Sequence, residues 1–523
     1  MTESLQSQLD TGIALLRAGH MDEAGKLAES LLEQYADNPE VHFYAADAAS
    51  MGGDHKAAIA CLQSLPQTGP GSARVLLRKA QLLFSDRQRG DALETARAAA
   101  KFVESDERQL RGVARILSDC QDVEGARQWL QDAHRILPQS TQILFDLAVT
   151  EFHLNLPEDA EQHIDTLLQL RPLHPGALHL RSALRTQTSE CNHVEDLQDR
   201  LAREPQNTNL VSATGFALAK EYEDLEQYDA SFTALNRGAA AYRGTLNYDS
   251  GVELAAHEQI RAGFTREALS SLAPGCETEG PIFIIGMPRS GTTLVERLLS
   301  SHSQVSSIGE FRDFPLMLSD LAGRGQPDVS ADVSDVDASL AVDFCELGER
   351  YTAAARQLAG DSPYFVDKLP YNFLYCGYIF AALPNAKLIH LTRDPLDTCY
   401  AMYKTLFFGA YSYSYDLVEL ADYFISYHRQ MRHWHEVLQG QILDVSYEQL
   451  VQGPESQARR IVEWCGLPWE EAVLDFHNQD SPSMTASAMQ VRKPMSTDSI
   501  GAWQRAGSGF DPVRERLLRE GLI

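Results

Sequence analysis

A glycine-bounded loop near the middle of the chain carries the residues best suited to chemistry. Residues 281–293 read PIFIIGMPRSGTT, and Gly286 and Gly291 keep the G-x-x-x-x-G spacing of a phosphate-binding loop. The backbone amides of such a loop, ahead of a helix, form a cradle for an anion. Thr292 stands where ATP and GTP hydrolases have the lysine that reaches the β- and γ-phosphates. The loop therefore predicts binding of the phosphate end of a nucleotide that does not need that lysine.

Four further segments carry charged or polar residues that could serve the same site. With the loop, the set is PRSGTT at 288–293, GE at 309–310, DKLPYN at 367–372, LPNAKLIHLTRDPLD at 383–397, and SAMQVRKP at 487–494 with Trp503 downstream. In this order they resemble the sulfotransferases that use 3′-phosphoadenosine 5′-phosphosulfate (PAPS) as sulfuryl donor. The resemblance is closest to the protein-tyrosine sulfotransferases and their bacterial relatives.

The resemblance implies that the loop holds the 5′-phosphosulfate of the donor. The implied cradle consists of Arg289, Ser290, Gly291, Thr292 and Thr293. Arg289 also corresponds to the catalytic arginine of the family, whose planar guanidinium can brace sulfate oxygens. Lys368, in DKLPYN, corresponds to the catalytic lysine beside the bridging oxygen. Without the resemblance, the loop would be an ordinary strand-to-helix turn and Lys368 a surface cation.

Glu310 corresponds to the glutamate that takes the acceptor's proton in the tyrosine-modifying branch. A general base must lie within hydrogen-bond reach of the proton that it removes. His302 is the competing base, because it also matches a histidine of the family, but it falls where a helix ends. We therefore assign Glu310 as the base and expect a structural role for His302.

The family's contacts to the nucleotide fall in the second half of the matched region. Arg393 corresponds to the arginine that binds the 3′-phosphate, and Tyr447 to a tyrosine near the nucleotide. Ser487, Arg492 and Lys493 correspond to residues that bind the cofactor and clasp the 3′-phosphate. One departure concerns Ala401, which stands where the family has a serine that contacts the 3′-phosphate. Thr398 and Tyr400 are candidates to replace its hydrogen bond.

Short apolar runs predict the sheet that positions these residues. Residues 282–285 and 387–391 read as buried parallel strands, and residues 441–445 as a third. A helix is expected at 293–301, directly after the loop. Strands alternating with helical patterns indicate a P-loop-like α/β domain with a central parallel sheet.

The first half of the chain repeats. Ala24, Ala58, Ala92, Ala126 and Ala160 recur every 34 residues, each in a helix-like stretch that follows a polar turn. This period is typical of tetratricopeptide repeats, in which a small residue lets paired helices approach closely. A further unit with Ala230 out of phase gives six or seven repeats.

The fold class predicted is therefore an all-α tetratricopeptide solenoid followed by an α/β sulfotransferase domain. The expected limits are 1–265 for the solenoid and 280–523 for the second domain, with a Pro/Gly-containing boundary between them.

Composition narrows the partners. Of 523 residues, 73 are acidic and 45 basic, a net charge of −28, which argues against binding nucleic acid. No apolar run is long enough to span a membrane and no secretory signal is visible, so a cytoplasmic protein is expected. The eight cysteines show no metal-binding spacing, and no metal is expected.

The function expected is sulfuryl transfer from PAPS to a hydroxyl group, with a polypeptide tyrosine favoured and a carbohydrate or small molecule left open. The repeats are expected to recruit the acceptor or a protein partner. Two other classes compete: a nucleotide kinase or hydrolase, and a repeat scaffold with an inactive nucleotide fold. The missing lysine speaks against the first, and retention of Arg289, Glu310 and Lys368 against the second.

Overall fold

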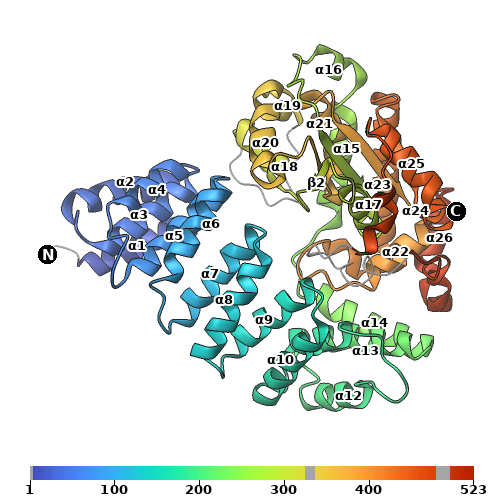
Figure 1. The fold of residues 1–523 in the computed structure, drawn as a ribbon, viewed down its shortest axis with the longest axis horizontal. Helices are drawn as coiled ribbons and strands as arrows, with labels where there is room; N and C mark the ends of the chain where they lie inside the picture. Colours follow the sequence, from blue (N-terminus) through green and yellow to red (C-terminus); the bar gives the residue numbers. More distant parts are fainter. Residues whose placement is uncertain (1–3, 324–335, 479–494) are drawn as a thin grey trace. The chain divides into compact units, whose positions relative to one another are not determined.

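The computed structural model describes residues 4–323, 336–478 and 495–523 (Figure 1). The chain divides into two compact units, Met1–Thr150 and Glu151–Ile523. The division along the chain falls within one helix, α9 (Thr141–His153). The domain limits expected from the sequence, 1–265 and 280–523, remain a prediction, since repeat limits and packing units need not coincide.

The first unit consists of paired helices. They are α1 (Leu5–Arg17), α2 (Met21–Gln34), α3 (Pro39–Met51), α4 (His55–Gln63), α5 (Ser72–Ser85), α6 (Arg89–Ala100), α7 (Glu107–Asp119) and α8 (Val123–Ile136). Asp54, Asp106 and Asp122 cap the helices that follow them by accepting a backbone N–H. The repeat pattern continues into the second unit through α10 (Pro157–Leu170).

The periodic alanines behave as predicted. All five lie on the second helix of their pair and have no exposed surface, so the helices approach closely there. The turn before each of these helices contains one residue with positive φ, at positions 19, 53, 87, 121 and 155. The first two are glycines, which tolerate this conformation best, and the other three are Arg87, Gln121 and Asn155. A left-handed turn is therefore part of the repeat.

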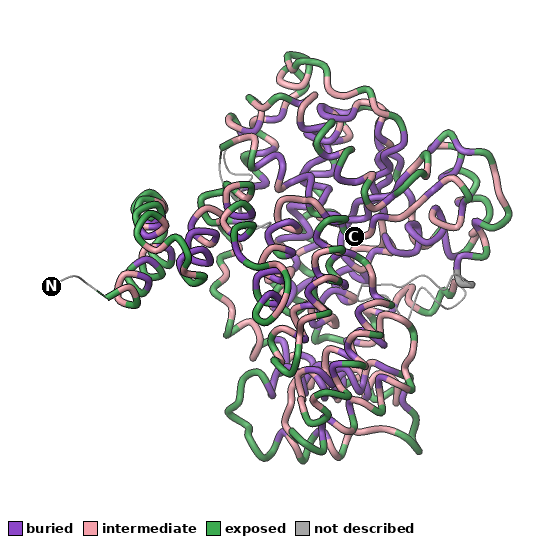
Figure 2. Tube along the Cα trace, turned by 60° about the vertical axis from the view of Figure 1, so that its left-hand side comes forward, coloured by how far each residue is buried: buried purple, intermediate pink, exposed green. Residues whose placement is uncertain are grey.

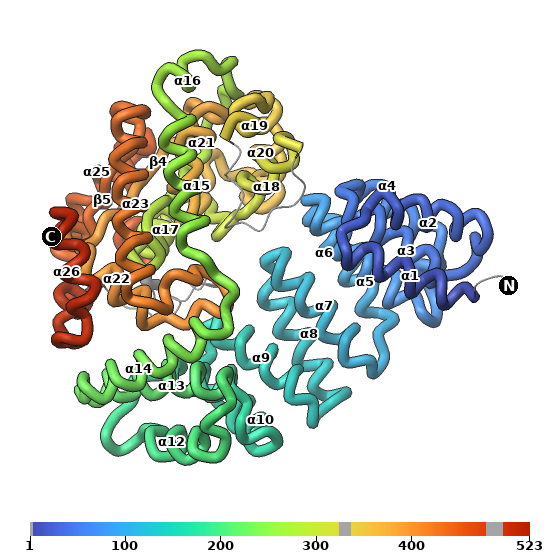
Figure 3. The backbone as a smooth tube through the Cα atoms, turned by 180° about the vertical axis from the view of Figure 1, so that it is seen from behind, coloured from blue at the N-terminus to red at the C-terminus, as the bar shows by residue number. Residues whose placement is uncertain are grey.

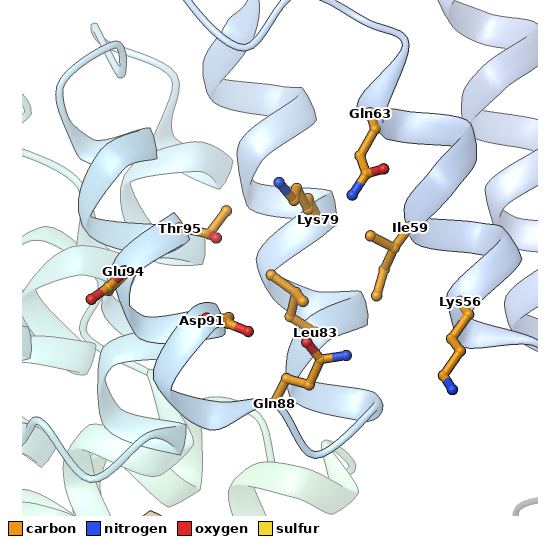
Figure 4. Close-up of a pocket in the computed structure, with 9 residues that line it drawn as sticks. All are labelled: Lys56, Ile59, Gln63, Lys79, Leu83, Gln88, Asp91, Glu94 and Thr95. Carbon is orange, nitrogen blue, oxygen red and sulfur yellow. The ribbon is translucent and has the colours of Figure 1, made fainter.

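A pocket of about 490 Å³ lies on the first unit, where α4, α5 and α6 meet (Figure 4). Lys56 and Lys79 contribute positive charge to its lining, and Asp91 and Glu94 contribute negative charge. The pocket is thus polar and of mixed charge.

The second unit starts with the helices that precede the sheet. They are α10, α11 (Pro175–Ala183), α12 (Val194–Arg203), α13 (Thr208–Asp224), α14 (Tyr228–Arg243), α15 (Ser250–Gly263) and α16 (Arg266–Ser271). Within the described residues, α1 to α8 form four helix pairs, and α13 packs with α14. Helices α11 and α12 are joined by a longer connection, and each of them packs against α13.

A five-stranded parallel sheet follows, with strand order β2-β3-β1-β4-β5. Its strands are β1 (Pro281–Gly286), β2 (Val305–Ser307), β3 (Tyr364–Asp367), β4 (Lys387–Thr392) and β5 (Ile442–Ser446). The three strands predicted from the sequence are β1, β4 and β5, so the parallel sheet is confirmed; β2 and β3 were not predicted. The register pairs Ile284 of β1 with Ile389 of β4.

Helices cover both faces of the sheet, as Figure 3 shows from behind. They are α17 (Thr292–Ser300), α18 (Asp313–Leu321), α19 (Val336–Leu340), α20 (Phe344–Ala359), α21 (Cys376–Ala382), α22 (Pro395–Tyr403), α23 (Leu417–Val437), α24 (Tyr447–Gln452), α25 (Pro454–Trp464) and α26 (Asp511–Arg519). Four short 3-10 helices complete the unit: η1 (Pro370–Tyr375), η2 (Ser412–Tyr415), η3 (Glu471–Asn478) and η4 (Ala502–Phe510).

Alternate residues of β1 serve different cores, because successive strand side chains point to opposite faces. Ile282 and Ile284 pack with α17, α24 and α25, whereas Phe283 and Ile285 pack with α20, α21 and α23. Both cores contain strand residues of the sheet, and Figure 2 shows the buried positions gathered in the interior with exposed positions on the outer turns.

The last repeat helices share a core with the sheet. Phe216 of α13, Phe232 of α14 and Ile260 of α15 belong to the same buried cluster as Phe283. Removing these helices would therefore expose the core of the α/β part.

Candidate active site

Each strand of the sheet ends shortly before a residue that the sequence predicts to act on the ligand. Parallel strands place their carboxyl ends at one edge of a sheet, and ligands of open α/β folds bind there. In the order β1 to β5, these residues are Arg289, Glu310, Lys368, Arg393 and Tyr447. The fold therefore gathers along one edge side chains that lie far apart in the sequence.

The phosphate-binding loop, residues 286–293, depends on its glycines. Gly286 has φ of 147° and Gly291 has φ of 107°, conformations that favour glycine. A Cβ on Gly291 would come within 2.7 Å of Tyr447 Cδ2, so a side chain there would push the loop away from the tyrosine ring. Arg289, with φ of 65°, occupies the left-handed region that other residues seldom adopt. Such strain concentrates at ligand-binding sites.

The loop and the start of α17 have the properties of an anion site. No side chain caps the N-terminus of α17, so the amides of Thr292 and Thr293 lie at an open helix end. Ser290 Oγ is buried and has no hydrogen-bond partner within the described ranges. Burial and the neighbouring Arg393 lower the pKa of Arg289 to about 10. A bound anion would raise this pKa again, because it would favour the charged guanidinium. These residues fit the phosphosulfate end of a nucleotide.

Arg393 joins the loop to the C-terminal segment. Its guanidinium donates to the backbone oxygens of Arg289 and Ser499, at 2.9 and 2.8 Å. It also lies over the ring of Tyr447, 4.7 Å from the centroid. The hydroxyls of Tyr447 and Ser499 are 2.7 Å apart. Three of the predicted residues, Arg289, Arg393 and Tyr447, thus lie together.

Asp397 positions the segment that follows. Its two carboxylate oxygens accept the backbone N–H groups of Gly501 and Trp503, at 2.7 and 3.0 Å. Sequence reasoning quoted Asp397 and Trp503 in separate motifs but gave neither a role. Ser499 was missed altogether, and nothing in its local sequence distinguishes it.

Lys368 and Glu310 form the second half of the edge. Lys368 is fully buried and its Nζ donates to Glu310 Oε1 at 2.6 Å, with Glu296 Oε2 at 3.7 Å. Burial alone would lower the pKa of Lys368, but the charges of Glu310 and Glu296 outweigh it and raise the pKa. Lys368 is therefore an ammonium ion. Glu296 is a further residue that sequence reasoning missed.

His302 has a structural setting. Its Nδ1 accepts the N–H of Gln304 at 3.1 Å, and its Nε2 lies 2.8 Å from the backbone oxygen of Pro468. With both ring nitrogens bonded to the backbone and the ring buried, it is poorly placed to take a proton from an acceptor. This geometry supports the structural role expected for it.

The region of Ala401 lacks the hydroxyl that the family pattern calls for. Thr398 donates its hydroxyl to the Asp394 carbonyl of its own helix at 2.9 Å, and Tyr400 is buried against Phe510. The Thr398 hydroxyl is therefore already bonded within the helix, and the Tyr400 ring packs in the core. Ser487, Arg492 and Lys493 lie outside the described residues.

One group of three side chains in the described ranges could hold a metal ion: His390, His435 and Asp444. Asp444 Oδ1 lies 2.6 Å from His390 Nδ1 and 3.1 Å from His435 Nε2. Although burial raises the pKa of Asp444, the bonds to both imidazoles hold it well below its usual range. The three groups satisfy one another, and none of the residues predicted to bind the nucleotide is among them.

The comparisons with known proteins agree with this architecture. Residues 281–471 match the model of the sulfotransferase family, and residues 15–82 match a tetratricopeptide repeat model. The resemblance and the fold class expected from the sequence are thereby confirmed. No described helix is long and apolar enough to cross a membrane.

Relatives match over different parts of the chain. An uncharacterized protein of Aquifex aeolicus is 27% identical over 534 residues, covering 98% of this chain and 69% of its own length. Protein-tyrosine sulfotransferase 1 of Danio rerio is 27% identical over 242 residues, covering 42% of this chain and 65% of its own. Among solved structures, the sulfotransferase domain of the Synechococcus PCC 7002 olefin synthase matches 47% of this chain and 97% of its own, at 18% identity and a TM-score of 0.35.

Proposed function

We propose that this chain, which carries a sulfotransferase-family domain after tetratricopeptide repeats, transfers a sulfuryl group from PAPS to a hydroxyl acceptor. The observation that carries the proposal is the arrangement along the sheet edge. A loop with an open helix end and Arg289 and Arg393 lies at the ends of β1 and β4, and the Lys368–Glu310 pair lies at the ends of β3 and β2. An anion cradle and an acid–base pair therefore share one edge.

The nucleotide would lie along the loop. Arg289, Ser290, Gly291, Thr292 and Thr293 would hold the 5′-phosphosulfate through backbone amides, hydroxyls and the guanidinium. Arg393 would bind the 3′-phosphate, with Tyr447 stacked against it. Ser487, Arg492 and Lys493 would add contacts from the segment before Ser499, as the family resemblance implies.

When bound, the donor supplies a sulfuryl group whose S–O bond to the 5′-phosphate breaks as the acceptor oxygen bonds to sulfur. Glu310 takes the proton that the acceptor hydroxyl loses. Lys368 donates a hydrogen bond to the oxygen that leaves with the phosphate, where negative charge grows. Arg289 braces the sulfuryl oxygens. Lys368 also holds the Glu310 carboxylate in place through its 2.6 Å bond.

The favoured acceptor is a polypeptide tyrosine, because relatives that match the α/β part are protein-tyrosine sulfotransferases. A carbohydrate or small-molecule acceptor is the alternative, since the matched motifs bind the donor and not the acceptor. The repeats would recruit the acceptor or a protein partner. The mixed charge of the pocket on α4, α5 and α6 suits a segment that carries both signs (Figure 4).

Calorimetry of 3′-phosphoadenosine 5′-phosphate (PAP), the desulfated donor, tests the nucleotide half of the proposal. The full chain should bind PAP equally well with and without a chelator. The loop lacks the lysine of triphosphate-binding loops, and the proposed site does not use a metal ion. Preference for ATP, or loss of binding with the chelator, would argue for a kinase or hydrolase instead.

A further inference from the structure

A carboxylate of the repeats binds two cations of the α/β part. Glu223, at the C-terminal end of α13, accepts from Lys404 Nζ with both oxygens at 2.8 Å. Its Oε1 also accepts from Arg505 at 3.0 Å. Although burial raises the pKa of Glu223, Lys404 and Arg505 outweigh it and lower the pKa. Glu223 is therefore ionised and balances both cations.

Lys404 lies close to Ala401, the position where the family pattern has a serine that contacts the 3′-phosphate. It caps the C-terminal end of α22, three residues after Ala401, so the two lie on the same face of that helix. Its ammonium also lies 4.6 Å from the centroid of Tyr400 on that helix. About a quarter of the side chain remains exposed, at 28%. The ammonium has three N–H donors, and Glu223 engages it through two carboxylate oxygens.

The cations around this point repel one another. Burial lowers the pKa of Lys404, and Arg505 and Arg289 lower it further, so that Glu223 only partly offsets them. Arg393 in turn lowers the pKa of Arg289. Arg505 donates to the backbone oxygen of Asp498, and Arg393 to that of the next residue, Ser499. Arg393 and Arg505 thus donate to adjacent residues of one short segment, and Glu223 links Arg505 to Lys404.

We propose that Lys404 and Arg505 complete the 3′-phosphate site with Arg393, and that Glu223 positions them from the repeat helix. The inference rests on the proposed function, because it takes PAPS as the donor. An anion near Ser499 would relieve the repulsion among these cations and use the remaining N–H of Lys404. A lysine one turn along the helix replaces the serine that the family pattern places at Ala401. The donor site accordingly includes a residue of the repeats.

The test compares two nucleotides that differ in the 3′-phosphate. PAP carries this group and AMP lacks it, so the ratio of their dissociation constants measures what the 3′-phosphate contributes. In the full chain, Lys404→Met should weaken PAP binding about ten- to a hundredfold, the range of a charge-assisted hydrogen bond, and leave AMP binding nearly unchanged. Lys404→Arg keeps the charge and should retain most of the ratio.

Lys220→Met is the matched control. Lys220 lies on α13, the helix of Glu223, and forms an ion pair with Asp224 of the same helix, but it is not part of the proposed site. It should leave both constants unchanged. Should Lys404→Met fold poorly, the double variant Lys404→Met with Glu223→Gln removes the cation together with its carboxylate partner, and Glu223→Gln alone is its reference, because Arg505 loses the same partner in both.

The possible failures are distinguishable. If wild-type protein binds PAP and Lys404→Met binds it equally well, the Lys404 site is wrong and the proposed function stands. If PAP and AMP bind equally to wild-type protein, the 3′-phosphate is not recognised at all and the inference fails with it. If wild-type protein binds neither nucleotide, the proposed function fails as well.

Discussion

Lys368 Nζ donates to Glu310 Oε1 at 2.6 Å, across the carboxyl ends of the neighbouring strands β3 and β2. The pair joins a buried cation to a carboxylate at the protein surface. Lys368 has almost no exposed area, whereas the Glu310 side chain is about one-third exposed, at 35%. In the proposed reaction the first would face the leaving group and the second the acceptor.

Glu310→Gln tests the base. It should lower turnover by about a hundredfold or more, because the amide cannot take the acceptor's proton. The affinity for PAP should stay nearly unchanged, since in the proposed reaction Glu310 would face the acceptor and not the nucleotide. Initial rates of sulfuryl transfer and calorimetry with PAP measure the two quantities.

His302→Ala is the comparison for that experiment. Because His302 bonds to the backbone of Gln304 and Pro468, its loss should lower the melting temperature more than the turnover of folded enzyme. Wild-type turnover in Glu310→Gln together with its loss in His302→Ala would show that the base assignment is wrong.

Lys368→Met tests the buried cation. It should lower kcat by about a hundredfold, as expected when a donor to developing charge is removed. It should also lower the free energy of unfolding by about 2 kcal/mol, because Glu296 and Glu310 lose their shared cation. Chemical denaturation and steady-state kinetics provide the readouts. Unchanged kcat with reduced stability would reduce Lys368 to a structural role.

Gly291→Ala tests the contact between the loop and Tyr447. A Cβ at this position would lie 2.7 Å from Tyr447 Cδ2 and would also strain a backbone with φ of 107°. We expect PAP affinity to fall about tenfold or more, because the loop must move away from the ring that Arg393 stacks on.

Gly440→Ala separates strain from contact. Gly440 has φ of 74° but no atom within 4 Å of a Cβ, so it has the backbone strain without the clash. Its cost should be limited to about 1 kcal/mol of stability, with PAP binding unaffected. Equal effects of both substitutions on PAP affinity would contradict the importance of the Tyr447 contact.

Glu253 predicts a pH dependence of stability. It is buried on α15, and its carboxylate accepts from Tyr248 Oη at 2.6 Å. Burial raises the pKa of Glu253 to about 7, although its bonds to Tyr248 and Tyr371 oppose this. Between its ordinary value of 4.5 and about 7 the folded protein therefore holds a proton that the unfolded chain releases. Stability should fall as pH rises through this window and level off above it.

Glu253→Gln should remove that contribution. As pH rises from 4.5 to 7.5, wild-type protein should lose up to about 3 kcal/mol of its free energy of unfolding that Glu253→Gln does not lose. Chemical denaturation of both proteins measures this difference. Glu258→Gln, at an exposed position of the same helix, is the control and should leave the slope unchanged. Parallel curves for wild type and Glu253→Gln would contradict the assignment.

The functional residues that follow the strands were easier to predict from the sequence than the strands themselves. Arg393 and Tyr447 directly follow apolar runs, and the fold places both at the sheet edge. Strands β2 and β3 contain only three and four residues, too few to show a periodic pattern, so they were not predicted. Their ends nevertheless carry Glu310 and Lys368, which were found through motifs.

Contacts between distant segments lay beyond sequence reasoning. The bond between Glu223 and Lys404 joins residues 181 positions apart, and nothing local marks either as a partner of the other. The repeats show the same limit. Their period predicted the buried alanines, but it did not predict that Phe216 and Phe232 pack in the core of the α/β part. Packing between elements decides this, and the period describes each repeat alone.

The most direct test of sulfuryl transfer uses donor labelled with radioactive sulfur. Full-length protein is incubated with labelled PAPS, a chelator and a cell extract, and the labelled species are separated and identified. The account predicts a labelled acceptor, a polypeptide if the tyrosine assignment is right, with wild-type protein and almost none with Glu310→Gln. Equal labelling by the two proteins, or no labelling by a wild-type protein that binds PAP, would contradict it.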